Sequence, residues 1–206
     1  RGPEPLAEAI FAQTRGMAAP DVLAQDYLDA EKGVETVADA LQGANDIIAE
    51  WISDDAAIRK SLRELLEKRG TLRSLAATEE DSVYRLYYDF SQPIAKLQGH
   101  QILAINRGEK EKFLTVKLEA PEDRILGYLR KQIMVRENPQ TSEFLEKVIE
   151  DSYRRLIAPA VEREIRNALT EQAEDGAIQV FGKNLEQLLM QPPIAGQVVL
   201  GWDPAF

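Results

Sequence analysis

Apolar side chains recur at intervals of three and four residues along most of this chain, the pattern of helices that bury one face. The pattern is clearest over residues 44–69, 121–157 and 159–189. In the last stretch it holds for about 30 residues, so an unbroken helix there would measure roughly 45 Å. We therefore predict a mainly α fold, a multi-helical scaffold with long helices, whose last helix is a strut for the shorter ones.

Residues 1–45 predict a separate unit of three short helices, and three helices joined by turns are compatible with a helix-turn-helix. A helix-turn-helix would contact DNA, but this segment carries a net charge of −5, which disfavours binding to phosphates. The other interpretation is a structural or protein-binding unit. Residues 46–193 follow as a central helical domain.

Capping and helix-ending residues indicate several boundaries. Thr36 is typical of a residue that caps a helix N-terminus. The run 53–55 (Ser-Asp-Asp) interrupts an apolar stripe and can cap a second segment, and Gly70 follows two cations as at a helix end. Pro159 either kinks the helix before it or lies in the first turn of a new one.

One stretch departs from helical spacing. Over residues 113–118, apolar and polar positions alternate, which predicts a strand and a minor β element held between helices. The apolar run 102–105 before it leads into Asn106, Arg107 and Gly108. We interpret that tripeptide as a turn or a helix stop, because glycine tolerates positive φ.

Four aromatic residues crowd into seven positions just before this element: Tyr84, Tyr87, Tyr88 and Phe90. Such rings can stack on the bases of single-stranded nucleic acid. They can equally form an aromatic core cluster. The neighbouring charges are mostly acidic, which favours the core cluster.

The charge balance weakens any direct contact with nucleic acid. The chain has a formal net charge of −10, and only residues 94–119 are net positive, at +2. There is no cysteine and a single histidine, which excludes thiolate zinc sites and sites with several histidines. The 44% apolar content is that of a soluble protein, no apolar run reaches membrane-span length, and a reducing cytoplasm fits the lack of cysteine.

The basic stretch supplies the candidate site residues. His100, Arg107, Lys110, Lys112 and Lys117 are candidates for a contact with a phosphate backbone. The acidic residues 109 and 111 interleave with them, so a solvated charged loop is the alternative. His100 has no serine, aspartate or second histidine at motif spacing, and can simply stabilise a turn or cap a helix. We predict no catalytic residue, no metal site and no cofactor.

Motifs along essentially the whole chain resemble the bacterial Tex family of transcription accessory proteins. They occur in the family's order: "EPLAE", "EKGV", "YYDFS", "ILAINRGEKE", "APAVEREIR", "VFGKNLEQLL" and "VLGWDPAF". Gln101 stands where the family usually has arginine, Lys112 where glycine is common, and Ala205 where many members have glycine. The missing arginine puts a phosphate contact at position 101 in doubt.

The resemblance implies a longer protein with a helical N-terminal and central region. An RNase H-like YqgF domain, helix-hairpin-helix elements and an OB-type RNA-binding domain would follow. On this basis the chain is a fragment, and residues 194–206 are a linker and the first strand of a truncated YqgF domain. Binding of nucleic acid, RNA more than DNA, would belong to the downstream modules and be weak or absent in this fragment.

The expected function is a non-catalytic central scaffold that positions the YqgF and RNA-binding modules of a Tex-like protein. Two alternatives remain open: a direct nucleic-acid-binding module through residues 100–117, and a docking platform for transcription or ribosome-associated proteins. A third, part of a nuclease, needs further carboxylates to complete a site with Asp203, since metal-assisted hydrolysis uses clustered acids.

Overall fold

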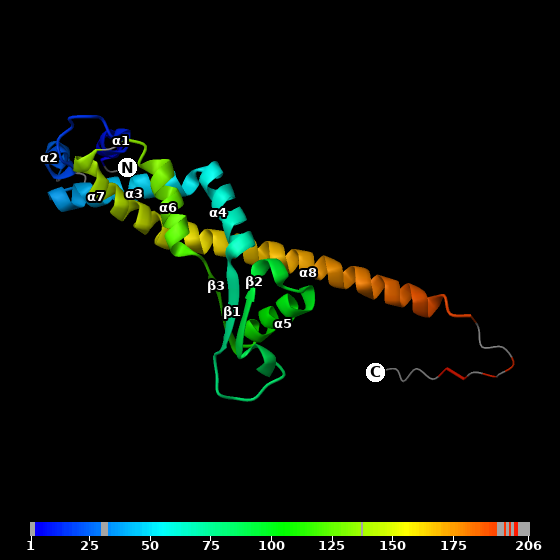
Figure 1. The fold of residues 1–206 in the computed structure, drawn as a ribbon. Coiled ribbons are helices and arrows are strands. Elements are labelled where there is room, and N and C mark those ends of the chain that lie inside the picture. The colour runs from blue at the N-terminus through cyan, green and yellow to red at the C-terminus, as the bar shows by residue number, and fades with distance from the viewer. Residues whose placement is uncertain are drawn as a thin grey trace.

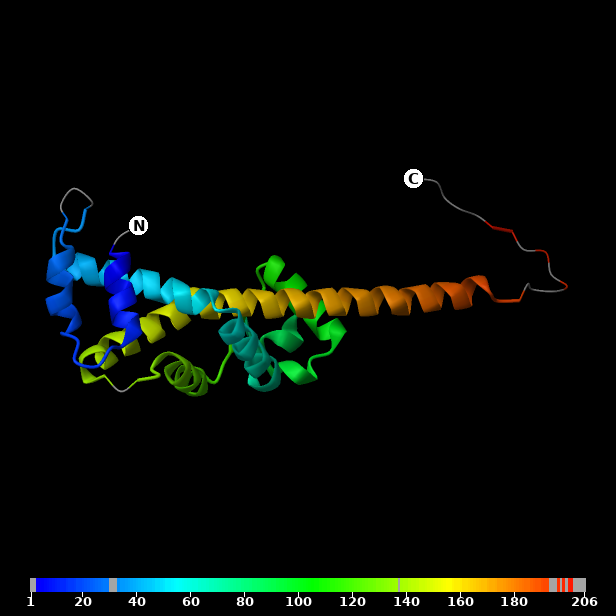
Figure 2. The same cartoon turned by 90° about the horizontal axis from the view of Figure 1, so that it is seen from above.

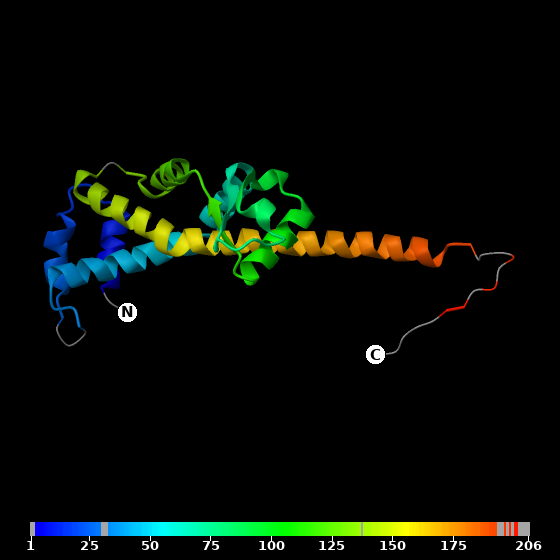
Figure 3. The same cartoon turned by 90° about the horizontal axis from the view of Figure 1, so that it is seen from below.

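A helix of 32 residues, α8 (Ala158–Leu189), runs through much of the molecule, and the other helices and the strands lie beside its N-terminal half or beyond its N-terminal end (Figure 1). The computed structural model describes residues 3–29, 33–136, 138–192, 196, 198, 200 and 201. Figures 2 and 3 show the C-terminal half of α8 projecting away from the other helices and the strands. The predicted mainly α fold with a long final helix is confirmed.

One apolar core holds the helical body together. It includes the fully buried Leu6, Ile48, Ile125, Leu145 and Ile165. The whole core draws side chains from these helices of the body: α1 (Glu4–Ala12), α2 (Pro20–Ala24), α3 (Val37–Asp54), α4 (Ala56–Arg69), α6 (Glu122–Ile133), α7 (Pro139–Asp151) and the start of α8. Because α3 runs through position 45, the units proposed over 1–45 and 46–193 share one helix and one core.

The caps of α3 and α4 are those that the sequence predicts. The Thr36 hydroxyl accepts a hydrogen bond from the Asp39 amide (3.1 Å), and the Asp39 carboxylate accepts one from the Thr36 amide (2.9 Å). The Asp55 carboxylate accepts from the amides of Ala57 and Ile58, at 2.8 and 2.9 Å. Each cap pairs amides that have no partner inside the helix.

A π-helical turn, Ser152–Ile157, joins α7 to α8 without a break. Pro159 follows it in the first turn of α8. A proline ring clashes with the carbonyl four residues earlier in a regular α-helix, so the wider turn gives it room. The buried Ser152 hydroxyl donates to the Ala49 carbonyl of α3 (2.8 Å), which fixes this joint against the body.

A small sheet hangs below the helical body in Figure 1, with α5 (Gly99–Lys110) on one of its faces. The strand order is β2-β1-β3, both pairs antiparallel. The strands are β1 (Thr71–Ala76), β2 (Asp89–Pro93) and β3 (Leu114–Glu119). The strand predicted near 113–118 is confirmed as β3, whereas β1 and β2 were not predicted.

The sheet and α5 enclose a second core around Leu72, Ile105, Leu114 and Val116. Tyr84 joins it with 6% of its surface exposed, and Tyr87, Tyr88 and Phe90 pack against it. The core-cluster interpretation of these aromatics is confirmed.

The turn expected at Asn106, Arg107 and Gly108 is wrong, because all three lie inside α5. Gly108 is buried, and a Cβ there would lie 2.6 Å from Leu114 Cδ1 and 3.1 Å from Tyr84 Cδ1. The glycine is therefore explained by close packing and not by positive φ. None of the described helices combines the length and hydropathy of a membrane span.

Candidate nucleic-acid interface

His100 lies in the first turn of α5 and is exposed at the edge of a groove beside α8. Within the described part of the chain, no hydrogen bond or ion pair of its side chain is found. Lys110 is ten residues further along the same helix, about 15 Å away at 1.5 Å per residue. The histidine and the lysines thus do not share one phosphate-sized site.

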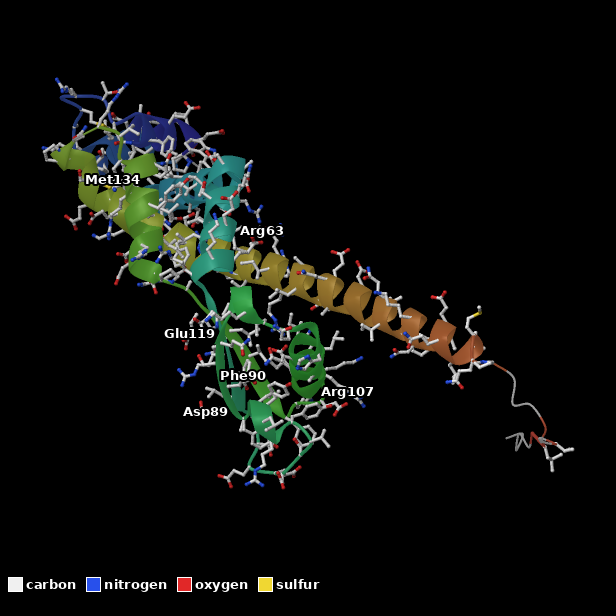
Figure 4. The ribbon with its side chains drawn as sticks, turned by 45° about the vertical axis from the view of Figure 1, so that its right-hand side comes forward. Arg63, Asp89, Phe90, Arg107, Glu119 and Met134 are labelled. Carbon is white, nitrogen blue, oxygen red and sulfur yellow. The ribbon has the colours of Figure 1, made fainter. Side chains whose placement is uncertain are left out.

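Arg107 is occupied by an acidic neighbour. Its Nε donates to Glu111 Oε1 (2.9 Å), and the Tyr84 hydroxyl donates to Glu111 Oε2 (2.8 Å). The hydrogen bond from Arg107, and then that from Tyr84, lower the pKa of the Glu111 carboxyl, whereas burial and the same carboxylate raise the pKa of Tyr84. Figure 4 shows Arg107 on the outward side of α5. The triad ties the end of α5 to the loop before β2.

Lys112 lies just after the C-terminus of α5 in a left-handed conformation, with φ 66°. The amide of Lys112 donates to Glu109 O (3.0 Å), and the amide of Phe113 donates to Gly108 O (2.9 Å). These two bonds form a Schellman motif, in which glycine is the usual residue at the Lys112 position. The backbone of Lys112 thus ends the helix in a standard motif. The exposed ammonium groups of Lys112 and Lys110 form no ion pair among the described residues.

Lys117 points to the outer face of the sheet, away from α5. It lies opposite Arg73 on β1, whose guanidinium forms an ion pair with Glu119 (3.1 Å). Glu119 is labelled at the end of β3 nearest the helical body in Figure 4. The structure therefore brings Lys110 and Lys112 near each other, but places His100 and Lys117 on separate surfaces.

The structure also has a groove that we did not predict. A groove of about 1040 Å³ lies between the end of α4, the residues around Ile94, the start of α5 and the middle of α8. Arg63, labelled on α4 in Figure 4, lines one side of it. The sequence signal for it is the apolar stripe of α8, which continues past Ala173, the last buried residue of that helix.

Metal chemistry has no assembled site in the residues that the structure describes. They contain no group of three or more histidine, cysteine, aspartate or glutamate residues able to hold a metal ion. Asp203 and most of residues 194–206, including half of the strand expected at 198–203, lie outside the described part.

Comparisons with known proteins agree along the chain. A family model described as Tex central region-like matches residues 16–181. YdcI of Bacillus subtilis is 48% identical over 212 residues, covering 100% of this chain and 29% of its own length. Protein tex of Bordetella pertussis is 32% identical over 221 residues, covering 100% and 28%.

A human relative extends the comparison beyond bacteria. The S1 RNA-binding domain-containing protein 1 is 35% identical over 190 residues, covering 85% of this chain and 19% of its own length. The chain thus spans less than a third of each of these relatives. The match to the family model covers most of the described helices and strands, and the chain belongs to the Tex central region-like family.

Proposed function

We propose that this chain is the non-catalytic central scaffold of a Tex-like transcription accessory protein, and that it positions RNA-binding modules elsewhere in the polypeptide. The relatives' names support the setting: one is a transcriptional accessory protein Tex of Neisseria gonorrhoeae, and another carries an S1 RNA-binding domain. The YqgF domain expected from the resemblance is among the modules that the scaffold would hold.

The exposed distal half of α8 is the observation that carries the proposal. No described residue of α8 beyond Ala173 is buried. Large apolar side chains there face solvent: Ile178 is 68% exposed, Phe181 67% and Leu189 73%. A helix with so much exposed apolar surface is typical of an element that another module covers.

A helix break tests this role. In a chimera of B. subtilis YdcI, this chain replaces the matching segment, and Gln179 in the distal half of α8 is changed to proline. Proline in a helix interior costs about 3 kcal/mol and disrupts the rod. We expect small-angle scattering to show an altered shape and RNA affinity to fall, while Gln179→Ala leaves both unchanged. Unchanged shape and affinity in the proline variant would contradict the scaffold.

A direct nucleic-acid contact is the second candidate, favoured by the neighbouring exposed ammonium groups of Lys110 and Lys112, which form no ion pair with a described residue. The test is a titration of the isolated chain with single-stranded RNA and duplex DNA from about 50 to about 200 mM salt. The scaffold proposal expects no binding at the lowest salt. Binding that weakens with salt, and disappears in an Arg107→Ala/Lys110→Ala/Lys112→Ala variant, would establish the contact instead.

A further inference from the structure

The helix α5 already shows how a helix packs on α8. Gly99 at its start lies against Ala173, where an added Cβ would be 3.4 Å from the Ala173 Cα. At its other end, Glu109 forms an ion pair with Arg166 (2.5 Å). Because the start of α5 meets the later residue of α8, the two helices run antiparallel, and small residues let their backbones come close.

The same surface of α8 continues past the start of α5, and no described element covers it there. Gly176, Ala177, Val180 and Phe181 follow Ala173 along the groove. Ile94, Leu97 and Leu103 form the opposite wall. The groove is thus a continuation of the α5–α8 interface. Its apolar residues suit the apolar face of a helix, and polar residues such as Arg63, Gln98 and His100 also line it.

Gly176 is the most informative residue of this surface. A Cβ added to it would have no atom within 4 Å. Glycine inside a helix costs about 1 kcal/mol relative to alanine, and nothing in the described structure requires it here. A second helix packed closely on this position, as α5 packs on Ala173, would explain the glycine, because a side chain there would hold the two backbones apart.

We propose that the groove seats one α-helix, antiparallel to α8 and end to end with α5. Past Ala173, the α8 residues that line the groove run from Gly176 to Asn184, about 12 Å at 1.5 Å per residue, so the occupant needs at least about two turns. The occupant comes from the remainder of a longer polypeptide, because the matching segment is only 29% of YdcI. This inference rests on the proposed scaffold role and names the element that the scaffold holds.

Hydrogen exchange in the YdcI chimera tests the seat, with the isolated chain as reference. We expect amides of 94–103 and 176–189 to exchange at least about tenfold more slowly in the chimera, since a seated helix suppresses local opening. Gly176→Leu fills the groove and should abolish this extra protection. Gly182→Leu is the matched control: it also replaces an α8 glycine with open space around it, but it does not line the groove.

The outcomes separate the two proposals. Protection of 176–189 alone, or protection that survives Gly176→Leu, would overturn the helix seat and leave the scaffold standing. If amides of the unmodified chimera exchange as fast as those of the isolated chain, both the helix seat and the scaffold role are overturned. Dimerisation of the isolated chain that Gly176→Leu abolishes would also overturn the seat, because a second copy would then be the occupant.

Discussion

At the scale of single residues, Lys112 combines an exposed side chain with an unfavourable backbone. Its φ of 66° is a conformation that glycine adopts without strain. We predict that Lys112→Gly raises the free energy of unfolding by about 0.5–1 kcal/mol. Chemical denaturation with matched m-values measures this.

The neighbouring lysine provides the control for this prediction. Lys110 lies in the last turn of α5, with an ordinary helical backbone. Lys110→Gly removes the same charge but should lower the free energy of unfolding, by up to about 1 kcal/mol. Equal effects of the two substitutions would show that the lost charge, and not the backbone conformation, determines the change in the free energy of unfolding.

The triad of Arg107, Glu111 and Tyr84 predicts a pH dependence. Hydrogen bonds from Arg107 and then Tyr84 lower the pKa of Glu111 from its ordinary 4.5. A carboxyl with a depressed folded-state pKa stabilises the fold above its unfolded pKa and loses that effect as pH falls through the folded value. At neutral pH the wild type should therefore have a higher Tm than Glu111→Gln. This difference in Tm should disappear as the pH falls below 4.5.

Thermal melts of both proteins from about pH 7 to about pH 2.5 check this expectation. Tyr84→Phe keeps the ring in the core and removes one of the two donors, so it should reduce the pH-dependent difference without removing it. A difference in Tm that stays constant over the whole range would contradict the role of Glu111.

At the scale of elements, the caps of α3 and α4 were predictable from the sequence. Asp55 accepts hydrogen bonds from two amides in the first turn of α4. Asp55→Ala should cost about 1 kcal/mol of stability. Asp54 lies in the last turn of α3, where an acid is unfavourable, so Asp54→Ala should be neutral or slightly stabilising. Urea denaturation compares them, and equal losses would refute the cap assignment.

Helices were predictable and two of the three strands were not, for reasons visible in β1. Its buried positions include Leu72 and Ser74, while Leu75 is 40% exposed. The apolar pattern therefore lacks the alternation that identifies a strand. β2 is five residues long and has one large apolar side chain, Phe90. Both strands depend on pairing with distant residues, which periodicity does not report.

At the scale of the whole molecule, linear proximity was a poor guide to the candidate site. His100 and Lys117 are close in sequence, yet α5 and the sheet separate them onto the groove edge and the outer sheet face. Charge counting along the chain also missed the pairing of Arg107 with Glu111. The apolar stripe of α8 was predicted, but where its burial ends depends on how far the other helices reach.

That end of burial gives the last prediction. Since no described residue of α8 beyond Ala173 is buried, removing residues 180–206 should leave the Tm within about 2 °C of the intact chain. Far-UV circular dichroism should show the lost helix, and the shorter chain should be more soluble because exposed apolar surface is gone. Ile165→Ala, in the buried half at 1% exposure, should instead cost about 2–5 kcal/mol and lower the Tm by at least about 4 °C. A comparable fall on truncation would mean that the distal half of α8 stabilises the body directly, and would remove the reason to expect another module on its apolar face.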